Sequence, residues 1–166
     1  PARCIGTDRR FRDRPVAIRD AQAQLRALLA RGAVRDALAY LNGLSGHRFT
    51  SLYRFDGETL HGVEFYDREH PEQTRTDEIP ITASYCVFVR DSHGHFHTPD
   101  SLLDPRLRDH PKRMAVRAYC GVPLLDPFGR ACGSVCHFDV EPRPTRAEDL
   151  SLLHALAREL GALERA

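Results

Sequence analysis

The sequence predicts an α+β domain in which helices from both ends of the chain flank an antiparallel sheet. Leucines repeat at helical spacing near both ends, over about residues 18–44 and 146–165. Five segments between them have the composition of strands and are separated by turn residues. Strands grouped between helices are typical of the α+β class, and 166 residues suit one domain.

The N-terminal leucine stripe predicts two helices. Gly32 is placed to break or bend this stripe, and Gly43 and Gly46 are placed to end it. Residues 1–15 are rich in Arg and have no hydrophobic period, so we expect a flexible arm there. Residues 16–166 would then form the single folded domain. The stripe consists of Leu25, Leu28, Leu29, Leu38, Leu41 and Leu44.

Two hairpins are predicted in the middle of the chain. Asp56-Gly57 joins residues 47–55 to 58–66 and is a strong hairpin signal. Residues 118–125 and 130–140 are joined by Asp-Pro-Phe-Gly, the composition of a type I turn. An apolar helix around Ser84–Arg90 and a short strand at 95–100 lie between the hairpins.

The C-terminal helix has a clear predicted start. Thr145 and Glu148 have the spacing of a capping box, and Asp149 would place a negative charge in the first turn. Asp104-Pro105 similarly predicts an N-cap and a first-turn proline for a short helix.

Composition excludes several classes of function. The chain has 24 basic and 23 acidic residues, a net charge of +1, which is unlike a nucleic-acid-binding surface. No apolar run reaches the length of a membrane helix, and the N-terminus lacks the apolar core of a signal peptide. We therefore expect a cytoplasmic protein without nucleic-acid or membrane partners.

The cysteines and histidines predict neither a disulfide framework nor a metal site. The five Cys are an odd number, and even spacing along a strand would put Cys132 and Cys136 on one face, about 13 Å apart. His93, His95 and His97 alternate and would share a face if extended, as a metal site requires. The residues before them have a turn composition, so we interpret them as solvated turn histidines.

The order of several motifs resembles the GAF domain family. Tyr119–Leu124 is followed by a Gly-bearing turn, then Gly133–Asp139, then Pro142-Arg143-Pro144 before the C-terminal helix. The segment SYCVFV and the later HTPDSLLDPRLRDHP resemble the middle of the same family. This resemblance covers about residues 18–165. It implies five or six antiparallel strands in a PAS-related fold, with terminal helices on one face and a roofed ligand pocket on the other.

Specialised branches of the family can be compared with this sequence. GAF domains sense cyclic nucleotides, tetrapyrroles or other metabolites, but the Asn-Lys-Phe-Asp-Glu signature of the cyclic-nucleotide branch is absent here. Bilin-binding members attach pigment through Cys-His in a helix, whereas Cys136-His137 falls in a predicted strand. The free methionine sulfoxide reductase branch uses roof cysteines. Cys86 lies near one such place, but the loop HPKRMAVRA contains no Cys.

Strand alternation and the resemblance together predict the pocket residues. Leu52, Val122 and Val135 are assigned to the helix side of the sheet. The same alternation permits either an open ligand pocket or a filled core. The predicted ligand-binding residues are Phe49, Ser51, Tyr85, Cys86, Val89, Thr98, Tyr119, Gly121, Ser134 and Cys136.

We interpret the chain as a sensory or regulatory module with no catalytic residues of its own, because no nucleophile triad, metalloprotease or phosphate-loop motif is present. It would bind a small-molecule ligand, and the sequence does not identify a cofactor. It would dimerise through its terminal helices and act on an effector domain or on a protein in trans. One alternative is a thiol-based redox enzyme or redox sensor of the free methionine sulfoxide reductase type that uses Cys86 with Cys120 or Cys136. Another is a purely structural module that dimerises through residues 18–44 and 146–165.

Overall fold

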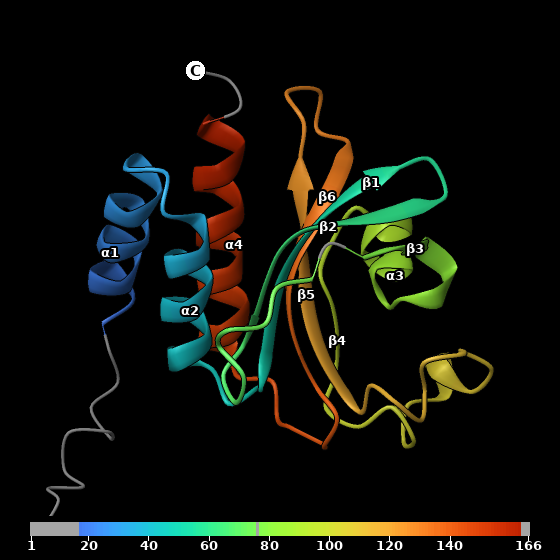
Figure 1. Cartoon of the computed structure of the whole chain (residues 1–166). Coiled ribbons are helices and arrows are strands. Elements are labelled where there is room, and N and C mark those ends of the chain that lie inside the picture. Colours follow the sequence, from blue (N-terminus) through green and yellow to red (C-terminus); the bar gives the residue numbers. More distant parts are fainter. Residues whose placement is uncertain (1–16, 76, 164–166) are drawn as a thin grey trace, which may run out of the picture.

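A six-stranded antiparallel sheet forms the centre of the protein (Figure 1). The computed structural model describes residues 17–75 and 77–163, so the flexible arm predicted at 1–15 lies outside the described residues. The strands lie in the order β3-β2-β1-β6-β5-β4. In chain order, the elements are α1 (Ile18–Ala30), α2 (Val34–Leu44), β1 (Phe49–Asp56), β2 (Thr59–Asp67), β3 (Glu78–Pro80), the 3-10 helix η2 (Ile81–Ala83), α3 (Cys86–Ser92), β4 (Phe96–Thr98), the 3-10 helix η3 (Pro105–Leu107), β5 (Ala118–Leu125), β6 (Ala131–Asp139) and α4 (Ala147–Leu163).

The predicted fold class and both hairpins are confirmed. β1 and β2 pair on either side of Gly57, whose φ of +56° is the conformation that glycine adopts most easily. β5 and β6 pair across the Asp126–Gly129 turn, in which the Gly129 N–H donates to the Asp126 carbonyl. Gly32 separates α1 from α2, as predicted, with a φ of +73°.

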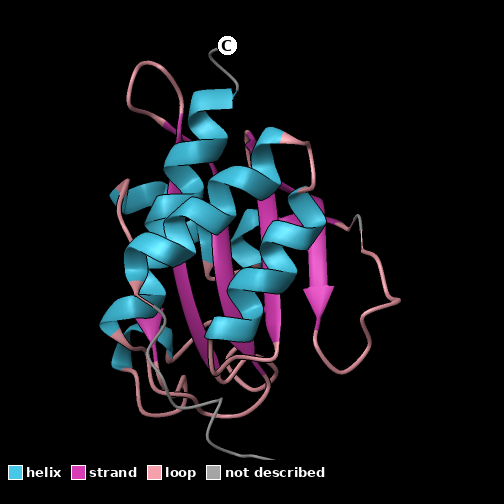
Figure 2. Ribbon diagram, turned by 90° about the vertical axis from the view of Figure 1, so that its left-hand side faces the viewer, coloured by secondary structure: helices cyan, strands magenta, loops and turns pink. Residues whose placement is uncertain are grey.

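The three terminal helices cover one face of the sheet (Figure 2). Leucines of α1, α2 and α4 pack with Leu52, Val122 and Val135, the three residues assigned to this face. Leu25, Leu153 and Leu156 are fully buried within this helix-side core. The helix-side core therefore brings together helices from opposite ends of the chain.

The roof covers the other face. It consists of η2, α3 and the loops around η3, which lie across the sheet from the terminal helices in Figure 1. Tyr85, Val89 and Leu107 are buried here against Tyr119 and Cys136 of the sheet. β5 and β6 therefore contribute alternate residues to two different cores.

Two local predictions are wrong. Cys132 packs on the helix side while Cys136 lies on the roof side, because the pairing register shifts between Leu124 and Leu125 and reverses the alternation. The predicted Thr145–Glu148 capping box does not form either. The Thr145 hydroxyl has no hydrogen-bond partner, and Asp149 instead accepts from the Arg146 N–H at 3.0 Å.

No helix within 17–75 and 77–163 is long and apolar enough to cross a membrane.

Candidate functional site

A cavity of about 190 Å³ lies between the sheet and the roof. Strands β1, β5 and β6 form its floor. The segment before β3, the η2–α3 connection and the loop after η3 form its walls. It is lined by Tyr53, Arg75, Asp77, Ile79, Ala83, Ser84, Tyr85, Lys112, Val116, Tyr119, Cys136 and Phe138.

The cavity has an aromatic interior and a charged rim. Tyr85, Tyr119 and Cys136 are at most 3% exposed and form its depth. Arg75, Asp77 and Lys112, by contrast, are exposed side chains. Apolar walls with a few polar groups are typical of small-molecule sites.

A thiol cluster lies at the inner end of the cavity. The Cys86 Sγ is 3.2 Å from the Ser134 Oγ, which donates to it, and 3.3 Å from the Tyr119 Oη. Cys136 is a further hydrogen-bond partner of Cys86. Cys86 is the first residue of α3, whereas the other three residues project from β5 and β6.

Gly121 lets the Tyr119 ring lie flat along its own strand. A Cβ at residue 121 would lie 2.3 Å from the Tyr119 Oη, a distance that no packed structure tolerates. The ring cannot easily move away, because Tyr85 packs edge-on against it at 5.6 Å. Gly121 therefore allows the hydroxyl to reach Cys86.

The two clustered thiols differ in acidity. Burial opposes ionisation of Cys86, but hydrogen bonds from Cys136, Ser134, Ser84 and Tyr119 outweigh it and lower the pKa of Cys86 to about 6. Burial raises the pKa of the Cys136 thiol well above its ordinary value. The hydrogen bonds therefore favour the thiolate form of Cys86, whereas burial favours the thiol form of Cys136.

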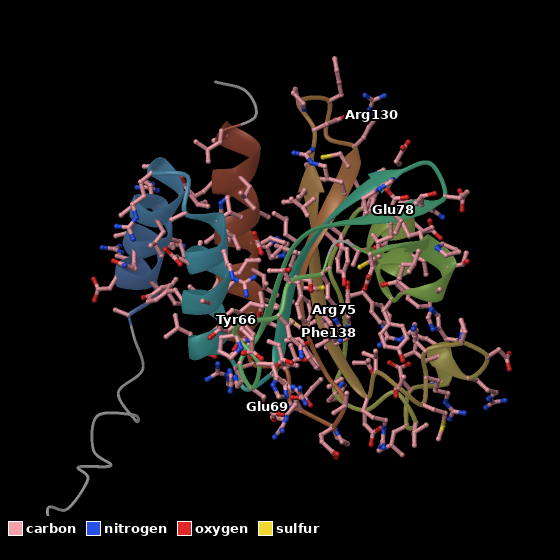
Figure 3. All side chains as sticks on the ribbon, viewed as in Figure 1. Tyr66, Glu69, Arg75, Glu78, Arg130 and Phe138 are labelled. Atoms are coloured by element: carbon pink, nitrogen blue, oxygen red, sulfur yellow. The ribbon has the colours of Figure 1, made fainter. Side chains whose placement is uncertain are left out.

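Two arginines fix the part of the rim that precedes β3, which we call the rim segment (residues 71–75 and 77). The Arg35 side chain of α2 donates to the carbonyls of Phe65, Pro71 and Gln73, which ties residues 71–73 to α2. Two residues further on, the Arg75 guanidinium lies 4.8 Å above the Phe65 ring. Phe138, whose ring centroid is 6.5 Å from that of Phe65, lines the same cavity as Arg75; both residues are labelled in Figure 3.

A buried histidine pair lies on the other side of β6 from Cys136. The rings of His47 and His137 stack at 5.8 Å, and the His137 Nδ1 is 2.7 Å from the Thr50 Oγ1. Burial, with a smaller contribution from His47, lowers the pKa of His137 to about 3. His137 is 1% exposed, and its strand position places it away from the cavity that Cys136 lines.

The predicted ligand-binding residues fall into two groups. Tyr85, Tyr119 and Cys136 line the cavity, and Cys86 and Ser134 lie directly behind them in the thiol cluster. The others lie around this site. Phe49 stacks on Phe138 at 4.8 Å, Ser51 lines a separate space of about 30 Å³, Val89 is buried in the roof, Thr98 pairs with Tyr119 across the β4–β5 ladder, and Gly121 lies beneath Tyr119.

Sequence reasoning missed the charged rim. Arg75, Asp77 and Lys112 come from polar loops, where no periodicity indicates which side chains face a cavity. Phe138 was assigned to the pocket side with Ser134 and Cys136, and it lines the cavity. Tyr53 was missed, although it continues the strand alternation that predicted Phe49 and Ser51. That alternation was sufficient to find Tyr53.

Cys120 does not belong to this site. It packs in the helix-side core, whereas Cys86 packs in the roof core on the opposite face of the sheet. The pairing of Cys86 with Cys120 that the sequence left open is therefore wrong. Within 17–75 and 77–163, no group of three His, Cys, Asp or Glu side chains is arranged to hold a metal ion.

A larger groove of about 620 Å³ lies elsewhere, among α2, β2 and the end of α4. Two of its charged residues, Arg35 and Glu64, already pair with each other at 2.9 Å. It is a surface groove without the buried polar cluster that the roof cavity has.

Terminal helices on one face of an antiparallel sheet and a roofed cavity on the other are the arrangement that the family resemblance implied for an α+β domain. Residues 25–163 match the family model described as GAF domain. The chain belongs to the GAF domain family.

One curated relative is the cyclic di-GMP phosphodiesterase PA2567 of Pseudomonas aeruginosa, 38% identical over 85 residues. This match includes 49% of the chain and 14% of the relative, so the chain spans about one seventh of that protein's length.

Several solved structures share the fold. The chromophore-binding domain of a Stigmatella aurantiaca bacteriophytochrome has a TM-score of 0.74 at 14% identity, over 96% of this chain and 63% of that one. A free methionine-R-sulfoxide reductase from Neisseria meningitidis, in complex with its substrate, has a TM-score of 0.69 at 20% identity, over 87% and 86%. A GAF sensor protein from Burkholderia vietnamiensis has a TM-score of 0.65 at 18% identity, over 87% and 93%. At these identities the likeness shows the fold alone.

Proposed function

We propose that this GAF domain is a regulatory module that binds a small metabolite in the roof cavity and has no catalytic activity of its own. The observation that carries this proposal is the 190 Å³ cavity, with its aromatic depth and charged rim. A collapsed core would leave no such space, because protein interiors are otherwise close-packed.

The volume limits the ligand. An engineered protein cavity of about 150 Å³ accepts benzene. By proportion, a cavity of 190 Å³ holds about eight non-hydrogen atoms. A cyclic nucleotide has more than twice as many, and a tetrapyrrole has many more. This favours a metabolite of amino-acid or organic-acid size over the other two ligand classes that the family resemblance suggested.

The signal would leave through the terminal helices. β5 and β6 line the cavity with Tyr119 and Cys136 and pack against α4 with the alternate residues Cys120 and Val135. A shift of either strand on ligand binding therefore changes the packing of α4. The module would act in the cytoplasm as a homodimer through these helices and regulate an effector domain or a partner protein.

Native mass spectrometry tests the proposal. Protein purified from its host is expected to carry a small molecule that is released on unfolding. Ala83→Phe fills the cavity from η2 and should remove the bound molecule, whereas Ala147→Phe, on the exposed first turn of α4, should retain it. Equal ligand content in both variants would contradict binding in the roof cavity.

The thiol cluster supports a second candidate, a thiol redox function. The Cys86 thiolate can attack hydrogen peroxide, so that hydroxide leaves and a sulfenic acid forms. The Cys136 thiol then attacks that sulfur, water leaves and a disulfide forms. The depressed pKa of Cys86, to about 6, and the adjacent Cys136 are the observations that favour it.

Peptide mapping after peroxide treatment separates this candidate from the first. A Cys86–Cys136 disulfide is expected in the wild type, and a persistent Cys86 sulfenic acid in Cys136→Ser. Cys120→Ser is the matched control, because Cys120 lies on the other face of the sheet and its substitution should change neither product. If Cys86 and Cys120 oxidise at the same rate, the redox function is wrong.

A further inference from the structure

Charges of both signs meet at the rim of the roof cavity. Arg75 and Asp77 lie two positions apart shortly before β3, and Lys112 lies in the loop after η3. All three line the cavity, and no ion pair links any of them to another. One negative and two positive groups are therefore available to a ligand at the same opening.

The rim segment is held in a defined position. The Gly62 N–H of β2 donates to the Asp77 carbonyl at 2.9 Å, and the Arg75 guanidinium packs on the Phe65 ring. A Cβ at residue 62 would lie 3.2 Å from the Asp77 nitrogen, so the segment lies tightly on β2. The two charges are thus attached to the sheet edge rather than to a free loop.

The depth of the cavity has a different chemistry from its rim. Tyr85, Tyr119 and Phe138 present aromatic surface, and Cys136 presents a protonated thiol. Burial and smaller effects of Cys136, Cys86 and Asp77 raise the pKa of Tyr53, so its hydroxyl stays neutral. A ligand would enter with an uncharged part first and keep its charged part at the rim.

We infer that the cavity takes a free amino acid or a close derivative that retains both the α-amino and the α-carboxylate group. This inference rests on the proposed function and names its ligand class. The ammonium group pairs with Asp77, the carboxylate pairs with Arg75 or Lys112, and the side chain occupies the aromatic depth. A limit of about eight non-hydrogen atoms corresponds to a medium-sized amino acid.

The charge pattern discriminates against simpler ligands. A carboxylate without an amino group leaves Asp77 facing the ligand without a partner, and an amine leaves Arg75 and Lys112 facing a like charge. Juxtaposed like charges disfavour a ligand even where an attractive pair forms nearby. Only a molecule with both groups matches the rim.

Calorimetric titration with matched probes tests the inference. L-Leucine, its deaminated counterpart 4-methylpentanoate and its decarboxylated counterpart isopentylamine share one apolar body. The panel of common L-amino acids is measured first, and the tightest binder is compared with its own acid and amine in the same way. The amino acid is expected to bind at least tenfold tighter than either counterpart.

Charge-removing variants locate the recognition. Asp77→Asn should weaken the amino acid by about threefold to tenfold and leave the deaminated acid unchanged or tighter, because rim ion pairs are partly solvated. Arg75→Gln should weaken both. Asp91→Asn on α3 and Arg130→Gln at the tip of the β5–β6 hairpin (Figure 3) are the matched controls and should change neither.

The outcomes separate the inference from the proposed function. If a carboxylic acid binds as tightly as its amino acid, or Asp77→Asn weakens both equally, the ligand class is wrong while the cavity remains a binding site. If no probe binds and a ligand lost in Ala83→Phe still co-purifies with the wild type, the ligand class alone is wrong. If no probe binds and native mass spectrometry finds no ligand, both are wrong.

Discussion

Acidification should destabilise the fold through the buried histidine His137. Its pKa is about 3 in the folded protein because of burial, against about 6.5 in an unfolded chain. Below pH 6.5 the unfolded state binds a proton on His137, whereas the folded state does not. The contribution of the neutral His137 to the free energy of unfolding is therefore fully present above pH 6.5 and is lost as the pH falls towards 3. Between pH 7.5 and 5.0 the loss is about 1.36 kcal/mol for each unit below 6.5, or about 2 kcal/mol.

Urea unfolding at several pH values between 5.0 and 7.5 measures this term. Asp139 and Asp149 also have lowered pKa values. Burial opposes the ionisation of both, but it is outweighed at Asp139 by hydrogen bonds from the Glu141 N–H and Arg143, and at Asp149 by hydrogen bonds from Arg146. Because carboxylates are ionised in both states above pH 5, these two residues do not contribute to the pH dependence in this window. His137→Asn can keep the contact with Thr50 and removes the titration. Between pH 7.5 and 5.0, the free energy of unfolding of His137→Asn should therefore fall by about 2 kcal/mol less than that of the wild type.

His70→Asn is the matched control, since the His70 side chain is 51% exposed. It should preserve the pH dependence of the wild type. Identical slopes for the wild type and His137→Asn would refute the reasoning, because His137 would then be no more protonated in the unfolded state than in the folded one.

Three further substitutions have defined outcomes. Gly121→Ala should displace the Tyr119 hydroxyl from Cys86 and so raise the pKa of the Cys86 thiol. The measurement is the midpoint of the thiolate absorbance in a pH titration, which should move to higher pH, and Cys86→Ser shows which absorbance belongs to Cys86. An unchanged midpoint argues against Tyr119 as a donor. Arg35→Ala should release residues 71–75 from α2, so that amide exchange at residues 72–75 accelerates while that of β6 does not. Unchanged protection at residues 72–75 would show that other contacts hold this segment. Leu153→Ala, in the helix-side core, should lower the free energy of unfolding by about 2–5 kcal/mol. Leu163→Ala, at a half-exposed position, should lower it far less. Similar losses in the two variants would contradict the packing described.

The sequence alone determined the sheet and its two faces. Alternation along the strands separated Leu52, Val122 and Val135 from Tyr119, Ser134 and Cys136, and the family resemblance assigned the first set to the helix side and the second to the roof side. Period-two patterning is a local property, and Asp56-Gly57 and Asp126–Gly129 marked the turns where it restarts. For these reasons the thiol cluster's residues were among those predicted, although their contacts were not.

Only the tertiary structure decided what departs from a regular period. The register shift between Leu124 and Leu125 moves Cys132 to the opposite face, and nothing in the local pattern signals it. At the start of α4, Asp149 competes successfully with the Thr145–Glu148 pair because its carboxylate reaches both the N–H and the side chain of Arg146.

The charged rim depended most on tertiary contacts. Arg75, Asp77 and Lys112 come from two separate loops, whose paths are fixed by distant contacts such as those of Arg35 and Gly62. A loop residue's orientation has no sequence period, because it follows from whichever distant elements satisfy its backbone. The sequence therefore predicted a roofed pocket on this sheet, while the fold alone supplied the charges that define its proposed ligand.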